Sequence, residues 1–120
     1  MGKKILIADD EPNIVVALEF LLQRKGYEVH IARNGEEALR LAEACLPDLV
    51  LLDVMMPLRS GYEVCKRLRE RPEWAHMKIV MLSAKGRDAE VAKGLGLGAD
   101  LYVTKPFSTS DLMAKIKALL

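Results

Sequence analysis

The chain has few of the features that mark membrane, disulfide-bonded and nucleic-acid-binding proteins. No apolar run approaches the roughly 20 residues that a membrane-spanning helix needs. Cysteine is scarce, and the spacing of Cys45 and Cys65 suits neither a zinc site nor a disulfide framework. The formal net charge of +1 lacks the basic excess of a domain that binds DNA or RNA by itself. We therefore expect no membrane contact, no zinc and no direct nucleic acid binding by this segment.

Low-complexity tracts, internal repeats and a signal peptide are missing too. A strand pattern follows directly on the first residues, Met-Gly-Lys-Lys-Ile-Leu. The two cysteines are expected to be buried free thiols, and both features favour a cytoplasmic location. Hydrophobic residues make up 51% and charged residues 29%, an ordinary globular balance. A length of 120 residues is near the commonest domain size. We predict one domain over residues 1–120.

The stretch from Leu49 to Pro57 is an apolar run that ends abruptly on a carboxylate, Asp53. Such a run predicts a strand buried on both faces, as in a parallel sheet. Pro57 cannot continue a central strand, so Asp53 should stand at the strand's carboxyl end, where open α/β sheets bind ligands. Asp53 is therefore the candidate reactive group. The alternative is a solvated aspartate that only starts a turn.

Strand and helix patterns alternate along the chain. Strands are predicted at residues 4–8, 28–32, 49–53, 78–83 and 101–104, and helices at residues 12–25, after the caps Asn34 and Ser60, at residues 87–97 and after the cap Ser108. Short connections of this kind require a parallel sheet with helices on both faces and right-handed crossovers. The predicted fold is α/β, a (βα)5 unit whose strands all end at one edge.

Two helices carry specific expectations. In the first, the apolar spacing predicts an inward face made of Ile14, Ala17, Leu18, Leu21 and Leu22. The helix at residues 87–97 is weakened by glycine, at about 1 kcal/mol for each glycine inside it. We expect that helix to be the least rigid.

The shared edge collects polar side chains from four of the five strand ends. They are Asp9, Asp10, Asp53, Ser83 and Lys105. Clustered carboxylates repel one another, and an oxygen-ligand site open to water suits a divalent cation such as magnesium. A cation beside a lysine and a hydroxyl can in turn receive a phosphoryl group. Singly, each residue could be a helix cap or a solvated side chain, but that reading requires five independent coincidences.

The chain resembles the receiver (CheY-like) domain of two-component response regulators over its whole length. The matching pieces are Ile7-Ala8-Asp9-Asp10-Glu11-Pro12, Leu51-Leu52-Asp53-Val54-Met55-Met56-Pro57 with Gly61 beyond, Leu82-Ser83-Ala84, and Gly98-Ala99-Asp100 running into Thr104-Lys105-Pro106-Phe107. The resemblance implies a flavodoxin-like fold with strand order 2-1-3-4-5. It also implies phosphorylation on an aspartate by a histidine kinase or a histidine phosphotransfer domain.

The resemblance assigns the metal and phosphoryl ligands by matched position. Asp53 would be the nucleophile and, with Asp10, would bind Mg²⁺ or Mn²⁺. Asp9 would act directly or through water, and Met55 would lend its backbone carbonyl. Lys105 would pair with the phosphoryl oxygens.

The resemblance also implies a switch. Ser83 would move its hydroxyl onto the phosphoryl group and Tyr102 would turn inward, changing the surface of the fourth helix, fifth strand and fifth helix. Ser83 replaces the commoner threonine conservatively. In the DNA-binding subfamily that dimerises through this surface, opposite charges line the interface, but Val91 and Leu101 are apolar here. We expect a monomer or a phosphorylation-dependent dimer, and not that charged dimer.

Three other functions compete with a signalling switch. An aspartyl phosphatase would need a second carboxylate where Met55 stands, and a flavodoxin-like cofactor module would be repelled by the acidic loop after the first strand. A scaffold-only receiver would usually lack one of the five edge residues. The chain is thus predicted not to be an enzyme beyond its own phosphorylation and dephosphorylation. Its kinase, its output and its status as a stand-alone or partial chain stay open.

Two finer expectations concern the edge. We expect a cis peptide between Lys105 and Pro106, partly from the resemblance and partly because the cis penalty at an X-Pro bond is only about 0.5–1 kcal/mol. We also expect a long-lived phosphorylated form, because Met55 and Lys85 would flank the path of the hydrolytic water and neither orients water well.

Overall fold

The computed structural model describes residues 2–120, so Met1 of the predicted domain lies outside the described residues. The elements are β1 (Lys4–Ala8), α1 (Pro12–Arg24), β2 (Glu28–Ala32), α2 (Gly35–Cys45), β3 (Leu49–Asp53), α3 (Gly61–Arg69), a short 3-10 turn η1 (Pro72–Trp74), β4 (Lys78–Ser83), α4 (Asp88–Gly96), β5 (Leu101–Thr104) and α5 (Thr109–Leu119). All five strands match the prediction. The fourth helix is one residue shorter at each end than the predicted range.

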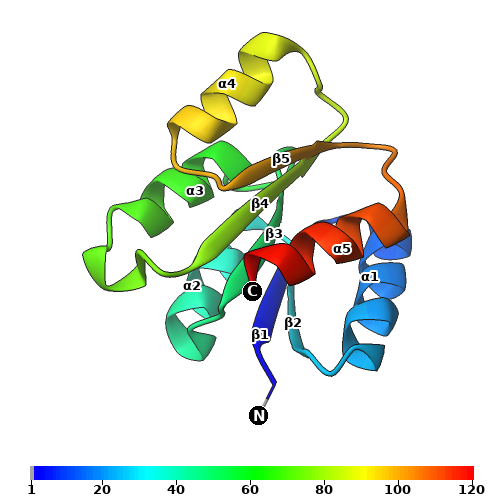
Figure 1. The fold of residues 1–120 in the computed structure, drawn as a ribbon. Helices are drawn as coiled ribbons and strands as arrows, with labels where there is room; N and C mark the ends of the chain where they lie inside the picture. The colour runs from blue at the N-terminus through cyan, green and yellow to red at the C-terminus, as the bar shows by residue number, and fades with distance from the viewer. Residues whose placement is uncertain (1) are drawn as a thin grey trace.

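The strands form one parallel sheet in the order β2-β1-β3-β4-β5, as predicted. β3 is the central strand because two strands lie on each side of it, and all five of its residues are buried. Figure 1 shows the twisted sheet at the centre of the molecule with helices on both sides. This is the predicted flavodoxin-like fold.

Two apolar layers hold the helices on the sheet. Val50 and Leu52 of β3 face a core shared with α2 and α3, which also receives the residues after α4. Leu49 and Leu51 face the core under α1 and α5. The alternation follows from the two-residue period of a strand, which sends successive side chains to opposite faces. In Figure 1, α1 and α5 accordingly lie on one side of the sheet and α2, α3 and α4 on the other.

The buried stripe of α1 differs from the expected one. Val15, Leu18 and Leu22 are buried, whereas Ala17 is exposed. Residues at positions i, i+3 and i+7 share one helix face, and Val15 belongs to that series while Ala17 lies beyond its edge. The prediction of an inward Ala17 was therefore wrong.

The predicted helix caps are confirmed. The side chains of Asn34, Ser60 and Ser108 each accept a hydrogen bond from the backbone N–H three residues on, at 2.8, 3.2 and 3.2 Å. These bonds satisfy donors that the first helical turn would otherwise leave open. None of the helices within residues 2–120 is both long and apolar enough to cross a membrane.

Arg69 of α3 ties together the edge of the sheet that lies opposite the strands' carboxyl ends. Its guanidinium donates to the carbonyls of Gly98 and Met77, at 2.9 and 2.7 Å, and to the carboxylate of Asp100, at 2.8 Å. That carboxylate also accepts from the N–H of Ile79, at 2.8 Å. The planar guanidinium thus fixes α3 against the start of β4 and the turn before β5.

Candidate functional site

Three carboxylates meet where β1 and β3 end. Asp9 and Asp10 follow β1, Asp53 is the last residue of the neighbouring β3, and one oxygen from each lies within 4.8 Å of the others. Asp9 and Asp53 are buried and Asp10 is exposed. An all-oxygen donor set with one side open to water fits a hard divalent cation such as Mg²⁺. The predicted acidic cluster is therefore present.

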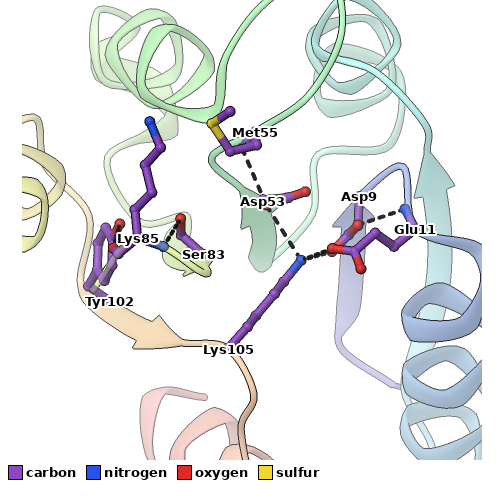
Figure 2. Close-up of polar contacts among 8 residues, drawn as sticks. All are labelled: Asp9, Glu11, Asp53, Met55, Ser83, Lys85, Tyr102 and Lys105. Atoms are coloured by element: carbon purple, nitrogen blue, oxygen red, sulfur yellow. Dashed lines mark hydrogen bonds and ion pairs between the residues drawn. The ribbon is translucent and has the colours of Figure 1, made fainter. Parts of the chain in front are cut away.

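Asp53 is only 3% exposed and is contacted by one hydrogen-bond donor and one cation. Its Oδ1 accepts from the N–H of Met55 at 3.3 Å and lies 3.5 Å from Nζ of Lys105 (Figure 2). Burial, followed by the negative charge of Asp9, raises the pKa of Asp53 to about 6 from 3.8. A nearby positive charge therefore favours the ionised form of this carboxylate.

The chain returns to Asp53 immediately after leaving it. The N–H of Gly61, the first residue of α3, donates to the carbonyl of Val54 at 2.8 Å. A Cβ on Gly61 would stand 2.3 Å from the carbonyl oxygen of Asp53, so only glycine allows this approach. The β3–α3 loop is thereby folded tightly over the end of β3.

Lys105 reaches the cluster from beyond β5. Its N–H donates to the carbonyl of Ser83 at 2.8 Å, and the Lys105–Pro106 peptide is cis, as predicted. Its Nζ lies 2.6 Å from Glu11 Oε1 and 3.1 Å from Asp9 Oδ2, in addition to the Asp53 contact. Burial disfavours the ammonium, but the hydrogen bond to Glu11 and the charges of Asp53 and Asp9 together raise the pKa of Lys105.

Ser83 and Tyr102 both bind the loop between β4 and α4. The buried Ser83 Oγ accepts from the N–H of Lys85 at 3.0 Å. The Tyr102 hydroxyl donates to the carbonyl of Lys85 at 2.6 Å. Figure 2 shows this pair apart from the hydrogen-bonded Lys105, Asp9 and Glu11. Within residues 2–120, neither hydroxyl is hydrogen-bonded to a carboxylate of the cluster.

Most of the predicted site residues therefore meet at one edge, with Ser83 and Tyr102 beside the charged group. Glu11 is the participant that the sequence did not identify as a lysine partner. The sequence indicates only that it belongs to the acidic loop after the first strand. Its place between Asp10 and the first helix was the available signal, because it puts the side chain at the same edge of the sheet.

A doubly wound α/β sheet with three carboxylates and a lysine at its carboxyl edge defines the CheY-like class of signalling domains. Within that class, a model of the response regulator receiver domain matches residues 5–117. The chain belongs to this family.

Full-length relatives are transcriptional regulators. The chain is 50% identical over 120 residues to the alkaline phosphatase synthesis transcriptional regulatory protein PhoP of Bacillus subtilis, covering all of this chain and 49% of that protein. It is 49% identical over 121 residues to the phosphate regulon transcriptional regulatory protein PhoB of Rhizobium meliloti, covering 53% of that protein. The chain thus spans about half the length of these curated relatives.

Solved structures agree in fold. The chemotaxis response regulator CheY4 of Vibrio cholerae is 31% identical, with a TM-score of 0.93 over the full length of both chains. The beryllofluoride-activated DrrB receiver domain is 37% identical, with a TM-score of 0.89 over 99% of this chain and 97% of that one. The chain is thus a receiver domain of a signalling family, not a conventional enzyme. Members of the family generally bind Mg²⁺ and interact with histidine kinases.

Proposed function

We propose that Asp53 is the phosphoacceptor of a two-component phosphorelay. The supporting observation is the position of its buried carboxylate at the end of β3, 3.5 Å from the Lys105 ammonium. In the proposed step, an Asp53 oxygen attacks the phosphorus of phosphohistidine. The phosphorus–nitrogen bond breaks and the imidazole keeps the electron pair, while Lys105 and Ser83 donate to the phosphoryl oxygens.

The acidic cluster is the proposed Mg²⁺ or Mn²⁺ site. Asp10 and Asp53 would ligate the ion, with Asp9 acting directly or through water and Met55 offering its carbonyl. Bound there, the ion would supply positive charge against the carboxylates and the phosphoryl oxygens. The fit rests on the close approach of the three carboxylates and on the raised pKa of Asp53, which reflects burial and the negative charge of Asp9.

The proposed output is a change in the surface formed by α4, β5 and α5. Ser83 would leave the Lys85 N–H for a phosphoryl oxygen, and Tyr102, whose hydroxyl donates to the Lys85 carbonyl, would turn inward as Ser83 moves. Both starting contacts lie on the β4–α4 loop. That loop therefore connects the site to α4.

The proposed phosphoryl donor is a histidine kinase or a histidine phosphotransfer domain, acting in the cytoplasm, where the family typically works. The half-length match to transcriptional regulators suggests an output domain or a target protein at α4, β5 and α5. Direct contact with nucleic acid is not assigned to this segment. Its proposed state is a monomer or a phosphorylation-dependent dimer.

The test is phosphorylation by acetyl phosphate, followed by intact-mass spectrometry. We expect the parent to gain one phosphoryl group with Mg²⁺ present, and to gain none with EDTA or in Asp53→Asn. The control Asp111→Asn alters an exposed aspartate on α5 and should be labelled like the parent. Labelling of Asp53→Asn at the parent's level, or labelling that survives EDTA, would contradict the assignment.

A further inference from the structure

The Glu11 side chain binds Lys105 instead of capping its own helix. Glu11 is the N-cap residue of α1, but its side chain makes no capping hydrogen bond. Its backbone N–H is held by Asp9 Oδ1 at 2.9 Å, which fixes where the side chain starts. Its Oε1 lies 2.6 Å from Lys105 Nζ, while the side chain is 55% exposed (Figure 2).

Lys105 is already occupied by carboxylates. An ammonium has three N–H donors, and Glu11, Asp9 and Asp53 all lie within 3.5 Å of it. A phosphoryl group arriving on Asp53 would bring new oxygens that need the same donors. One present partner must then give way.

Glu11 is the partner most readily released. Asp9 and Asp53 are buried, so losing the lysine would leave each charge with a backbone N–H but no cation among residues 2–120. The half-exposed Glu11 carboxylate can turn into solvent and be hydrated there. The Glu11–Lys105 contact, the shortest of the three, is therefore also the easiest to break.

We propose that Glu11 is a positioning residue that competes with the phosphoryl group for Lys105. By holding the ammonium in the unphosphorylated chain, it disfavours the phosphorylated state and sets how readily that state forms. The inference rests on the proposed function, because it assigns the competition to a phosphoryl group on Asp53.

The first test is the affinity for beryllofluoride, a noncovalent mimic of the phosphoryl group, in saturating Mg²⁺. We expect Glu11→Gln to bind it about threefold to fivefold more tightly than the parent, the range of a partly exposed ion pair. Acetyl phosphate should also label Asp53 faster in this variant. In that reaction an Asp53 oxygen bonds to phosphorus, the bridging phosphorus–oxygen bond breaks, and acetate leaves with the electron pair.

The second test distinguishes the loss of the Glu11–Lys105 contact from the loss of negative charge at position 11. Glu11→Asp keeps the negative charge on the same backbone, but its side chain is one methylene shorter and prefers to cap α1. We expect it to bind beryllofluoride as tightly as Glu11→Gln. Mg²⁺ alone, measured by calorimetry, should bind no more tightly to Glu11→Gln than to the parent. If the substitution only loosened the site, the affinities for Mg²⁺ and for beryllofluoride would both fall.

The matched control is Glu19→Gln. Glu19 lies on α1, the helix that Glu11 precedes, and its carboxylate forms no ion pair within residues 2–120. The proposal is overturned if Glu11→Gln binds beryllofluoride no better than the parent, if Glu11→Asp behaves like the parent, or if Glu19→Gln gains equally. Failure of the parent to bind beryllofluoride, or equal binding by Asp53→Asn, would instead contradict the proposed function and this inference with it.

Discussion

Burial makes the Asp53 carboxylate resist ionisation. Its folded pKa of about 6 exceeds the ordinary value of 3.8, because burial and the Asp9 charge disfavour the anion. The folded state therefore holds the proton more tightly than the unfolded state, and the free energy of unfolding falls as pH rises from about 4 to about 6. Above that window, the charged Asp53 remains destabilising.

We accordingly expect Asp53→Asn to be more stable than the parent in EDTA at about pH 8, by about 2 kcal/mol. Most of the gain should disappear at about pH 4, where Asp53 is protonated in the folded state and roughly half protonated in the unfolded state. Urea unfolding at the two pH values measures the difference. Asp111→Asn is the exposed control, and an equal pH-dependent gain there would contradict the prediction.

Met55 and Lys85 are expected to govern the lifetime of the phosphorylated form. Both are exposed, and Met55 is 56% exposed, so substitutions there leave the core intact. A thioether accepts hydrogen bonds weakly, and a protonated lysine cannot act as a base. Each tenfold loss of rate needs only about 1.4 kcal/mol of barrier, so we predict a lifetime on the order of hours.

Phosphate release from the parent, Met55→Asn and Met55→Asn/Lys85→Glu tests this prediction. We expect hydrolysis to accelerate stepwise, up to about a hundredfold in the double variant. Equal rates in all three proteins would mean that the backbone of the site sets the lifetime and that these side chains are bystanders.

Among the elements, α4 contains two glycines, and packing requires glycine at position 94 but not at position 96. A Cβ on Gly94 would lie 2.7 Å from Met81 Sδ and 2.8 Å from a ring carbon of Tyr102. A Cβ on Gly96 would meet nothing within 4 Å. Glycine at position 94 lets α4 approach β4 and β5, whereas at position 96 it only weakens the helix.

We predict opposite effects of alanine at the two positions. Gly96→Ala should raise the unfolding temperature by about 2–5 °C, because alanine lowers the entropy of the unfolded chain and favours the helix. Gly94→Ala should lower it, since Met81 and Tyr102 must move. Thermal unfolding of both variants measures this contrast, and a stabilised Gly94→Ala would refute it.

The surface of the assembled α4, β5 and α5 is apolar at the positions where charge was expected. Val91 and Leu101 are half-buried, and Leu95, four residues after Val91 on α4, is 45% exposed. Ion pairs between proteins weaken as salt screens them, with a Debye length of about 8 Å at physiological ionic strength. An interface centred on these apolar side chains would not weaken as the salt concentration rises.

We therefore expect the beryllofluoride-bound chain to form no dimer that dissociates when the salt concentration is raised. Sedimentation velocity at about 0.05 M and about 0.5 M salt should give the same distribution of species. The untreated chain serves as the control. A dimer that appears with beryllofluoride at low salt and disappears at high salt would contradict the prediction.

The strands and most of the site were predictable because they depend on local sequence, whereas the strand order was expected only from the family resemblance. Five apolar runs ending on polar residues determine a parallel sheet, and a parallel sheet places Asp9, Asp53 and Lys105 at one edge whatever the packing details. Side-chain caps at Asn34 and Ser60 were equally local. Each requires only a neighbouring N–H three residues away.

Partner choices between distant side chains were decided only by the tertiary structure. Sequence spacing could not distinguish Val15 from Ala17, because both lie near one helix stripe and the contacting sheet surface decides which is buried. It also could not pair Glu11 with Lys105, which are 94 residues apart and meet only after β1 and the chain beyond β5 have converged. Periodicity determines which face of an element turns inward, but long-range contacts exist only once the elements have packed.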